Sequence, residues 1–82
     1  PLNNMALVYL KKLDFDKSLE CYLKSYEIKK LEYADNSNML EISTVFQKIG
    51  LIYLIKNNYK KALEYLEKSY EIQKLVYGDN LY

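Results

Sequence analysis

Few residues in this chain of 82 could carry out chemistry. It has one cysteine, Cys21, and no histidine, so the commonest general base and the commonest metal ligand are missing together. A lone thiol without an imidazole partner indicates neither a catalytic nucleophile nor a metal site. We therefore expect Cys21 to be a half-buried small side chain.

Carboxylates are the other groups that could act as acids or bases. Glu67 and Glu71 lie four residues apart, which places them on one face of a helix, but the outer face of a helix offers no cleft for a dyad. We expect these residues to be solvated surface charge, as we do for two oppositely charged pairs of the same spacing, Glu20 with Lys24 and Glu64 with Lys68. The two glycines, Gly50 and Gly78, cannot build a phosphate-binding loop. The prediction is a protein that is not an enzyme and needs no cofactor.

Composition excludes further classes of function. The chain has 12 Lys+Arg, all of them lysine, against 11 Asp+Glu, and this balance is unlike that of a nucleic-acid-binding domain. No apolar run approaches the roughly 20 residues that cross a bilayer, and Pro1 to Asn4 lacks the features of a secretory signal. One cysteine cannot form an internal disulfide, so we expect a cytoplasmic protein. The charge balance and the lack of a long apolar run lead us to expect no nucleic-acid partner and no membrane partner.

An internal repeat with an offset of 44 residues organises the chain. The sequence Ser25 to Ile28 returns unchanged as Ser69 to Ile72, and about 17 of the 38 positions in residues 1–38 are identical to their equivalents in 45–82. Apolar residues within each unit are spaced by three and four, which predicts amphipathic helices. The expected helices are near 2–12, 15–33, 39–56 and 59–77. The predicted fold is therefore all-α, with two stacked antiparallel helical hairpins.

Four short signals predict where these helices begin and end. Asp14 and Asn58 precede the second helix of each unit and are suited to be N-caps. Asn38 and Glu41 have the spacing of a capping box, which would start the third helix. Gly78 is suited to the residue of positive φ that closes the last helix.

The units resemble the tetratricopeptide repeat. The second unit carries the pattern best, with Phe46, Ile49, Gly50 and Tyr53 on its first helix and Ala62, Leu66 and Ser69 on its second. Gly50 costs about 1 kcal/mol inside a helix, so we expect a close approach there, with Ala62 as the contact and Ala6 with Ser18 as the matching pair in the first unit. Serine stands at 25 and 69, where this family usually has alanine.

The resemblance implies one helical-repeat domain over residues 1–82, with repeat 1 at about 1–38 and repeat 2 at about 39–82. It also implies an α-solenoid fragment that serves as a scaffold for protein binding. The period of 44 exceeds the usual 34 and is similar to the long repeats of kinesin light chain, which bind peptide segments of cargo and adaptor proteins. Stable arrays usually have at least three repeats with polar caps, so we expect this chain to be part of a longer array.

In this family the first helices of successive hairpins line a concave groove. Carrying these positions over gives a groove to which Asn4, Leu10, Thr44 and Leu54 also contribute, and the expected contact residues are Asn3, Leu7, Lys11, Gln47, Lys48, Leu51 and Ile55. The two lysines favour a protein or peptide partner that carries acidic side chains. Packing against a neighbouring hairpin is the alternative for four of the apolar positions, Leu7, Leu10, Leu51 and Leu54. The absence of arginine argues against the subclass that grips a terminal carboxylate.

Tyrosine is unusually common, with 10 residues. We expect six of them to fill space between helices: Tyr9, Tyr22, Tyr26, Tyr53, Tyr59 and Tyr70. Tyr65 and Tyr82 are the candidates for a partner-facing surface. We also expect self-association through the exposed terminal helices, in particular the last one with Tyr65 and Tyr70.

Two other functions remain open from the sequence, and a third is disfavoured. The chain could be a structural spacer in a larger assembly, or the sensor segment of a bacterial regulator that responds to peptides. An RNA-binding helical array would need a basic face and repeats nearer about 35 residues, and the sequence has neither.

Overall fold

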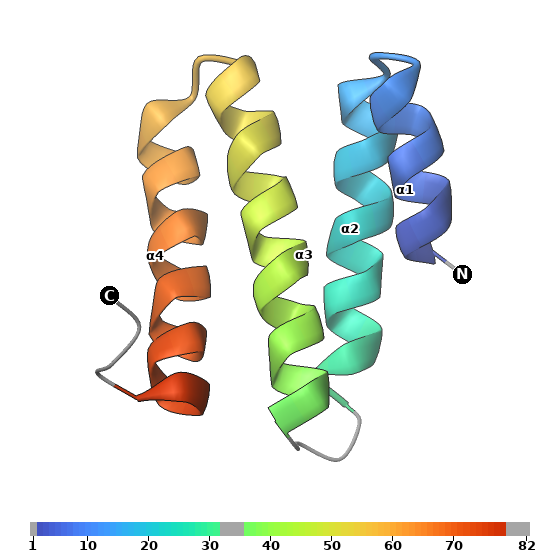
Figure 1. The fold of residues 1–82 in the computed structure, drawn as a ribbon. Coiled ribbons are helices and arrows are strands. Elements are labelled where there is room, and N and C mark those ends of the chain that lie inside the picture. Colours follow the sequence, from blue (N-terminus) through green and yellow to red (C-terminus); the bar gives the residue numbers. More distant parts are fainter. Residues whose placement is uncertain (1, 32–35, 79–82) are drawn as a thin grey trace.

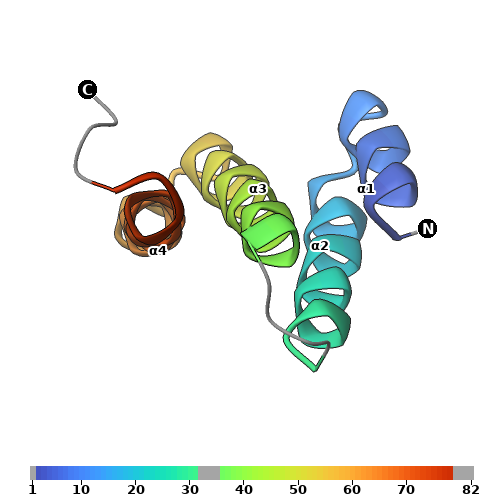
Figure 2. The same cartoon turned by 60° about the horizontal axis from the view of Figure 1, so that its bottom comes forward.

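Four helices build the part of the chain that the computed structural model describes, residues 2–31 and 36–78. They are α1 (Leu2–Lys11), α2 (Phe15–Lys29), α3 (Asn36–Ile55) and α4 (Tyr59–Tyr77). Each helix packs against the next along the chain, and both views show the order α4, α3, α2, α1 across the molecule (Figures 1 and 2). The predicted all-α fold of four helices packed pairwise is confirmed, and α1 and α4 lie at its two ends.

The two hairpin turns have the same geometry, as the repeat predicts. Leu13 and Asn57 occupy equivalent positions and adopt φ values of 62° and 63°. Asp14 and Asn58 follow them as N-caps, and each Oδ1 accepts a hydrogen bond of 3.3 Å from the backbone N–H three residues on. Gly78 closes α4 with a φ of 81°. These three capping predictions are confirmed.

The connection between α2 and α3 differs from the prediction. Helix α2 ends at Lys29 instead of residue 33, which lies outside the described residues, and α3 begins at Asn36. Asn38 is therefore inside the helix, and the predicted capping box is wrong. Its Nδ2 donates to the Lys29 carbonyl oxygen at 3.0 Å, and Glu41 pairs with the Lys29 ammonium at 2.5 Å. Both residues fasten the end of α2, where carbonyl groups lack partners within the helix.

Small residues bring the helices of each hairpin close together. A Cβ added to Gly50 would lie 2.8 Å from Leu66 Cγ and 3.3 Å from the Ala62 carbonyl oxygen. In the first hairpin the Ser18 hydroxyl donates to the Ala6 carbonyl oxygen at 2.9 Å. The predicted close approach is confirmed in both. The hydrophobic core joins both hairpins and consists of Ala6, Cys21, Tyr22, Val45, Phe46, Ile49 and Ile52.

Cys21 is more deeply buried than expected, because it faces this core. Among the tyrosines, Tyr22 is buried and three others pack at the edge of the core as predicted: Tyr9, Tyr26 and Tyr53. The prediction is wrong for Tyr59 and Tyr70, which are exposed because no described helix covers that side of α4.

Tyr65 also departs from its prediction, in the opposite direction. Its ring centroid lies 5.7 Å from that of Phe46 and 5.7 Å from that of Tyr53. It therefore points towards α3 and is half-buried, so it does not belong to an exposed surface of α4. The prediction for Tyr82 lies outside the described residues.

Candidate partner-binding surface

The apolar residues expected in the groove lie on α1 and α3, the first helices of the two hairpins. Leu7, Leu51, Leu54 and Ile55 have side chains that are 39% to 52% exposed. Leu10 packs against the core, as the packing alternative predicts, whereas the other three leucines are exposed among the described residues. Leu7 and Leu51 occupy equivalent positions, so exposed apolar side chains on two successive hairpins are available to a partner.

The polar groove residues differ in how accessible they are. Lys11 and Gln47 are exposed, and Lys48 is half-buried. Asn3 contributes to a pocket of about 320 Å³ between α1 and α2, where its Oδ1 atom is buried and has no hydrogen-bond partner among the residues described. The Asn3 amide oxygen thus lies against α2, and this residue, like Lys48, is half-buried.

The predicted contact residues of α1 lie close together on that helix, and so do those of α3. Leu7 and Lys11 are one turn apart on α1, and Gln47, Leu51 and Ile55 follow at successive turns of α3. The two groups are joined through α2, which packs against both α1 and α3. The surface thus consists of two strips of mixed apolar and polar side chains, one on α1 and one on α3.

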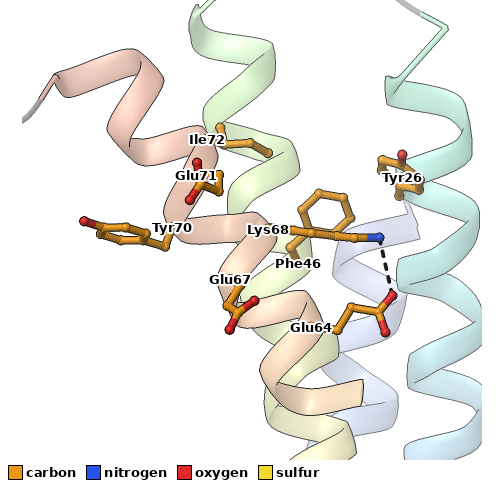
Figure 3. Close-up of a pocket in the computed structure, with 8 residues that line it drawn as sticks. All are labelled: Tyr26, Phe46, Glu64, Glu67, Lys68, Tyr70, Glu71 and Ile72. Atoms are coloured by element: carbon orange, nitrogen blue, oxygen red, sulfur yellow. Dashed lines mark ion pairs between the residues drawn. The ribbon is translucent and has the colours of Figure 1, made fainter. Parts of the chain in front are cut away.

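Sequence reasoning missed a second surface feature, a hollow of about 540 Å³ between α2 and α4 (Figure 3). Tyr26 of α2 and Phe46 of α3 line it, and α4 provides the rest: Glu64, Glu67, Lys68, Tyr70, Glu71 and Ile72. The figure shows the Tyr70 ring directed away from the other labelled side chains.

One of the lining residues is a cation of the chain itself, Lys68. Lys68 Nζ lies 5.0 Å from the Tyr65 ring centroid and 5.8 Å from that of Phe46, within the range of cation–π attraction. It also lies 3.8 Å from a Glu64 carboxylate oxygen. The spacing of Glu64 and Lys68 indicated their pairing, but the contribution of the rings depends on how α3 packs against α4.

Titratable groups in the described segments give no sign of acid–base catalysis. Burial raises the pKa of Tyr22, and burial, with smaller contributions from Tyr53 and Glu64, raises the pKa of Tyr65. A hydrogen bond to Glu27 and the charge of that residue raise the pKa of Lys30. All three shifts move a group further from neutrality, so none prepares a proton donor or acceptor for work near pH 7.

Comparison with known proteins gives one match. The family model of the tetratricopeptide repeat matches residues 1–75. No curated protein and no solved structure matches the chain. Within residues 2–31 and 36–78, no helix combines the length and the apolar character needed to cross a membrane.

Proposed function

Because the chain belongs to the tetratricopeptide repeat family, whose model covers residues 1–75, we propose that it is a non-catalytic module that binds a peptide or helix of a partner protein. Members of this family typically mediate protein–protein interaction. The observation that carries the proposal is the exposure of Leu7, Leu51 and Ile55 on the first helices of both hairpins.

In this proposal the apolar, amide and charged residues of the surface have different roles in binding. The exposed apolar side chains bury an apolar anchor of the partner, which supplies most of the binding free energy. The Gln47 amide can donate to and accept from the partner's backbone. Lys11 and Lys48 attract acidic side chains that flank the anchor and so select among partners.

The mode of binding follows from the length of the repeat. In this proposal residues 1–82 act as one domain of two repeats, about 1–38 and about 39–82. The 44-residue period is similar to that of kinesin light chain, and this similarity favours an extended peptide segment as the occupant. The partner then lies across both α1 and α3, and Asn3 contributes only if its side chain turns away from α2.

Selection from a random peptide library tests the proposal. The counter-target is the double variant Lys48→Glu with Leu51→Glu. A control of the same charge change carries Lys74→Glu with Leu75→Glu on α4, where both side chains are exposed. We expect an enriched motif with an apolar anchor and acidic neighbours, which binds the control as well as the original chain and fails to bind the double variant.

Either of two results would overturn the proposal. The first is enrichment that survives in the Lys48→Glu, Leu51→Glu variant while circular dichroism shows all three proteins folded. The second is no enrichment against the folded chain, which would favour a structural spacer.

A further inference from the structure

Helices α1 and α4 expose apolar residues whose equivalents on α3 and α2 pack in the core. The 44-residue offset makes α1 the equivalent of α3 and α4 the equivalent of α2. Helices α2 and α3 pack against each other, whereas α1 and α4 lie at opposite ends of the row (Figures 1 and 2). The chain therefore has a second set of the helix faces that form the α2–α3 interface, one face on α4 and the other on α1, and the two are not in contact with each other.

On α1, the exposed face is identified by comparing its residues with the buried residues at equivalent positions of α3. Ile49 and Ile52 are 0% exposed, and both belong to the core cluster that includes Cys21 and Tyr22 of α2. Their equivalents on α1, Met5 and Val8, are 49% and 55% exposed. Together with Tyr9 and Lys12 they line a groove of about 220 Å³. We call Met5 and Val8 the α1 outer face.

The α4 half shows the same relationship. Phe15 and Leu19 on α2 pack against the core. Their equivalents on α4, Tyr59 and Leu63, are 63% and 59% exposed. Tyr70 continues the same stripe two turns further along the helix. We call Tyr59 and Leu63 the α4 outer face.

We propose that the α4 outer face of one copy packs against the α1 outer face of a second copy, head to tail, in the geometry of the α2–α3 interface. The occupant is a second copy because both halves of the interface belong to this chain, and each half has the residue types that bury its equivalent inside the molecule. The contact is heterologous, so each dimer keeps one free face of each kind and can add further copies. Assembly then extends the internal repeat.

One difference between the repeats, Lys60 in place of the aspartate found at Asp16, makes the intermolecular contact weaker than the internal one. The internal interface contains an ion pair between Asp16 and Lys56. The equivalent positions between copies are Lys60 and Lys12, which repel each other. The substitution Lys60→Asp restores the opposite charges, so it should tighten association about fivefold if the contact follows the internal geometry.

The test is sedimentation velocity over a dilution series of the 82-residue chain and four variants. Val8→Glu blocks the α1 outer face, Leu63→Glu blocks the α4 outer face, and Lys60→Asp strengthens the contact. Leu75→Glu is the matched control, because Leu75 is 75% exposed and lies off the apolar stripe of α4. All substituted side chains are exposed, and circular dichroism checks that each variant is folded.

The expected pattern is specific to a head-to-tail contact. The original chain and Leu75→Glu associate with rising concentration, and Lys60→Asp does so at about fivefold lower concentration. Val8→Glu and Leu63→Glu are each monomeric alone, and their mixture forms a one-to-one dimer that does not grow. That dimer forms because Val8→Glu retains the α4 outer face and Leu63→Glu retains the α1 outer face.

Three results would overturn the proposal. One is a monomeric mass for both the original chain and Lys60→Asp throughout the series. Another is association of Val8→Glu equal to that of the original chain, which would indicate a symmetric contact between two α4 helices. The third is failure of the mixed variants to form a dimer while the original chain associates. The counter-target of the peptide selection changes only Lys48 and Leu51 on α3, which none of these variants alters, so the two proposals can fail separately.

Discussion

Ser43 on α3 and Ser69 on α4 bind each other reciprocally in the core of the second hairpin. The Ser69 hydroxyl lies 3.0 Å from the Ser43 carbonyl oxygen, and the Ser43 hydroxyl lies 3.2 Å from the Ser69 carbonyl oxygen. The two Oγ atoms are 2.7 Å apart, and both side chains are buried. Serine is accepted where the family usually has alanine because its hydroxyl is satisfied across the hairpin.

Replacing either serine should therefore be costly, and replacing both should cost less than the sum. We expect Ser69→Ala and Ser43→Ala each to lower the free energy of unfolding by about 1 to 2 kcal/mol, because each leaves a buried hydroxyl with fewer partners. The double variant removes both hydroxyls together. Urea denaturation followed by circular dichroism measures all three values, and strictly additive losses would show that the two residues do not depend on each other.

Gly50→Ala should destabilise the protein even though alanine favours helices. The gain in helix propensity is about 1 kcal/mol, but the new Cβ would lie 2.8 Å from Leu66 Cγ. Moving α4 or Leu66 away costs about 1 to 3 kcal/mol, so we expect a net loss of up to about 2 kcal/mol.

Leu66→Ala provides the background in which to test that cause. With the Leu66 side chain shortened, Gly50→Ala should lose most of its penalty, as thermal denaturation of the four proteins in the cycle would show. An equal penalty in both backgrounds would place the clash at the Ala62 carbonyl oxygen instead, 3.3 Å away.

Leu13→Asn should stabilise the first turn. Leu13 adopts a φ of 62°, which is unfavourable for leucine, and its side chain is 71% exposed, so little packing is lost on replacement. Asparagine occupies the equivalent position, Asn57, at almost the same φ. The expected gain is about 0.5 to 1 kcal/mol in urea denaturation, and the reverse change, Asn57→Leu, should lose a similar amount. A loss of stability in Leu13→Asn would contradict this explanation.

Tyr22→Phe should stabilise the protein, and more so at high pH. The Tyr22 hydroxyl is buried without a hydrogen-bond partner among the described residues, so its removal should add about 1 kcal/mol at pH 7. Burial raises the pKa of Tyr22 in the folded state above that of the unfolded chain. The contribution of Tyr22 to the free energy of unfolding is therefore fully present below the pKa of the unfolded chain, about 10. It is lost as pH rises through the higher pKa that Tyr22 has in the folded state.

Stability measured between pH 8 and about pH 11 tests this difference. The advantage of Tyr22→Phe over the original chain should widen above about pH 10. A constant difference across the range would mean that Tyr22 ionises normally in the folded state.

The internal repeat explains how much of the fold follows from sequence. Asp14 and Asn58 act as N-caps because a side-chain oxygen at that position needs only the local backbone to bind. Gly50 marked a close approach of helices because few other causes place glycine inside a helix. Such signals depend on a few neighbouring residues, and the repeat supplied the N-cap signal twice.

The remaining details depend on contacts between helices, which the local pattern does not contain. Asn38 has the spacing of a capping box, yet the carbonyl group that it binds belongs to Lys29 on another helix. Tyr59 lies on an apolar stripe like that of its equivalent Phe15, but only the stripe of α2 is covered by a neighbouring helix. Periodicity identifies an apolar face without indicating what covers it.

The measurement that tests the central claim most directly is an amide chemical-shift map of the chain during titration with a selected acidic peptide. If the peptide lies across the first helices of both hairpins, the largest changes will fall on α1 and α3, at Lys11, Gln47 and Leu51. Changes that are instead centred on Tyr26, Lys68 and Glu71 would place the partner in the hollow between α2 and α4 and contradict the proposed binding surface.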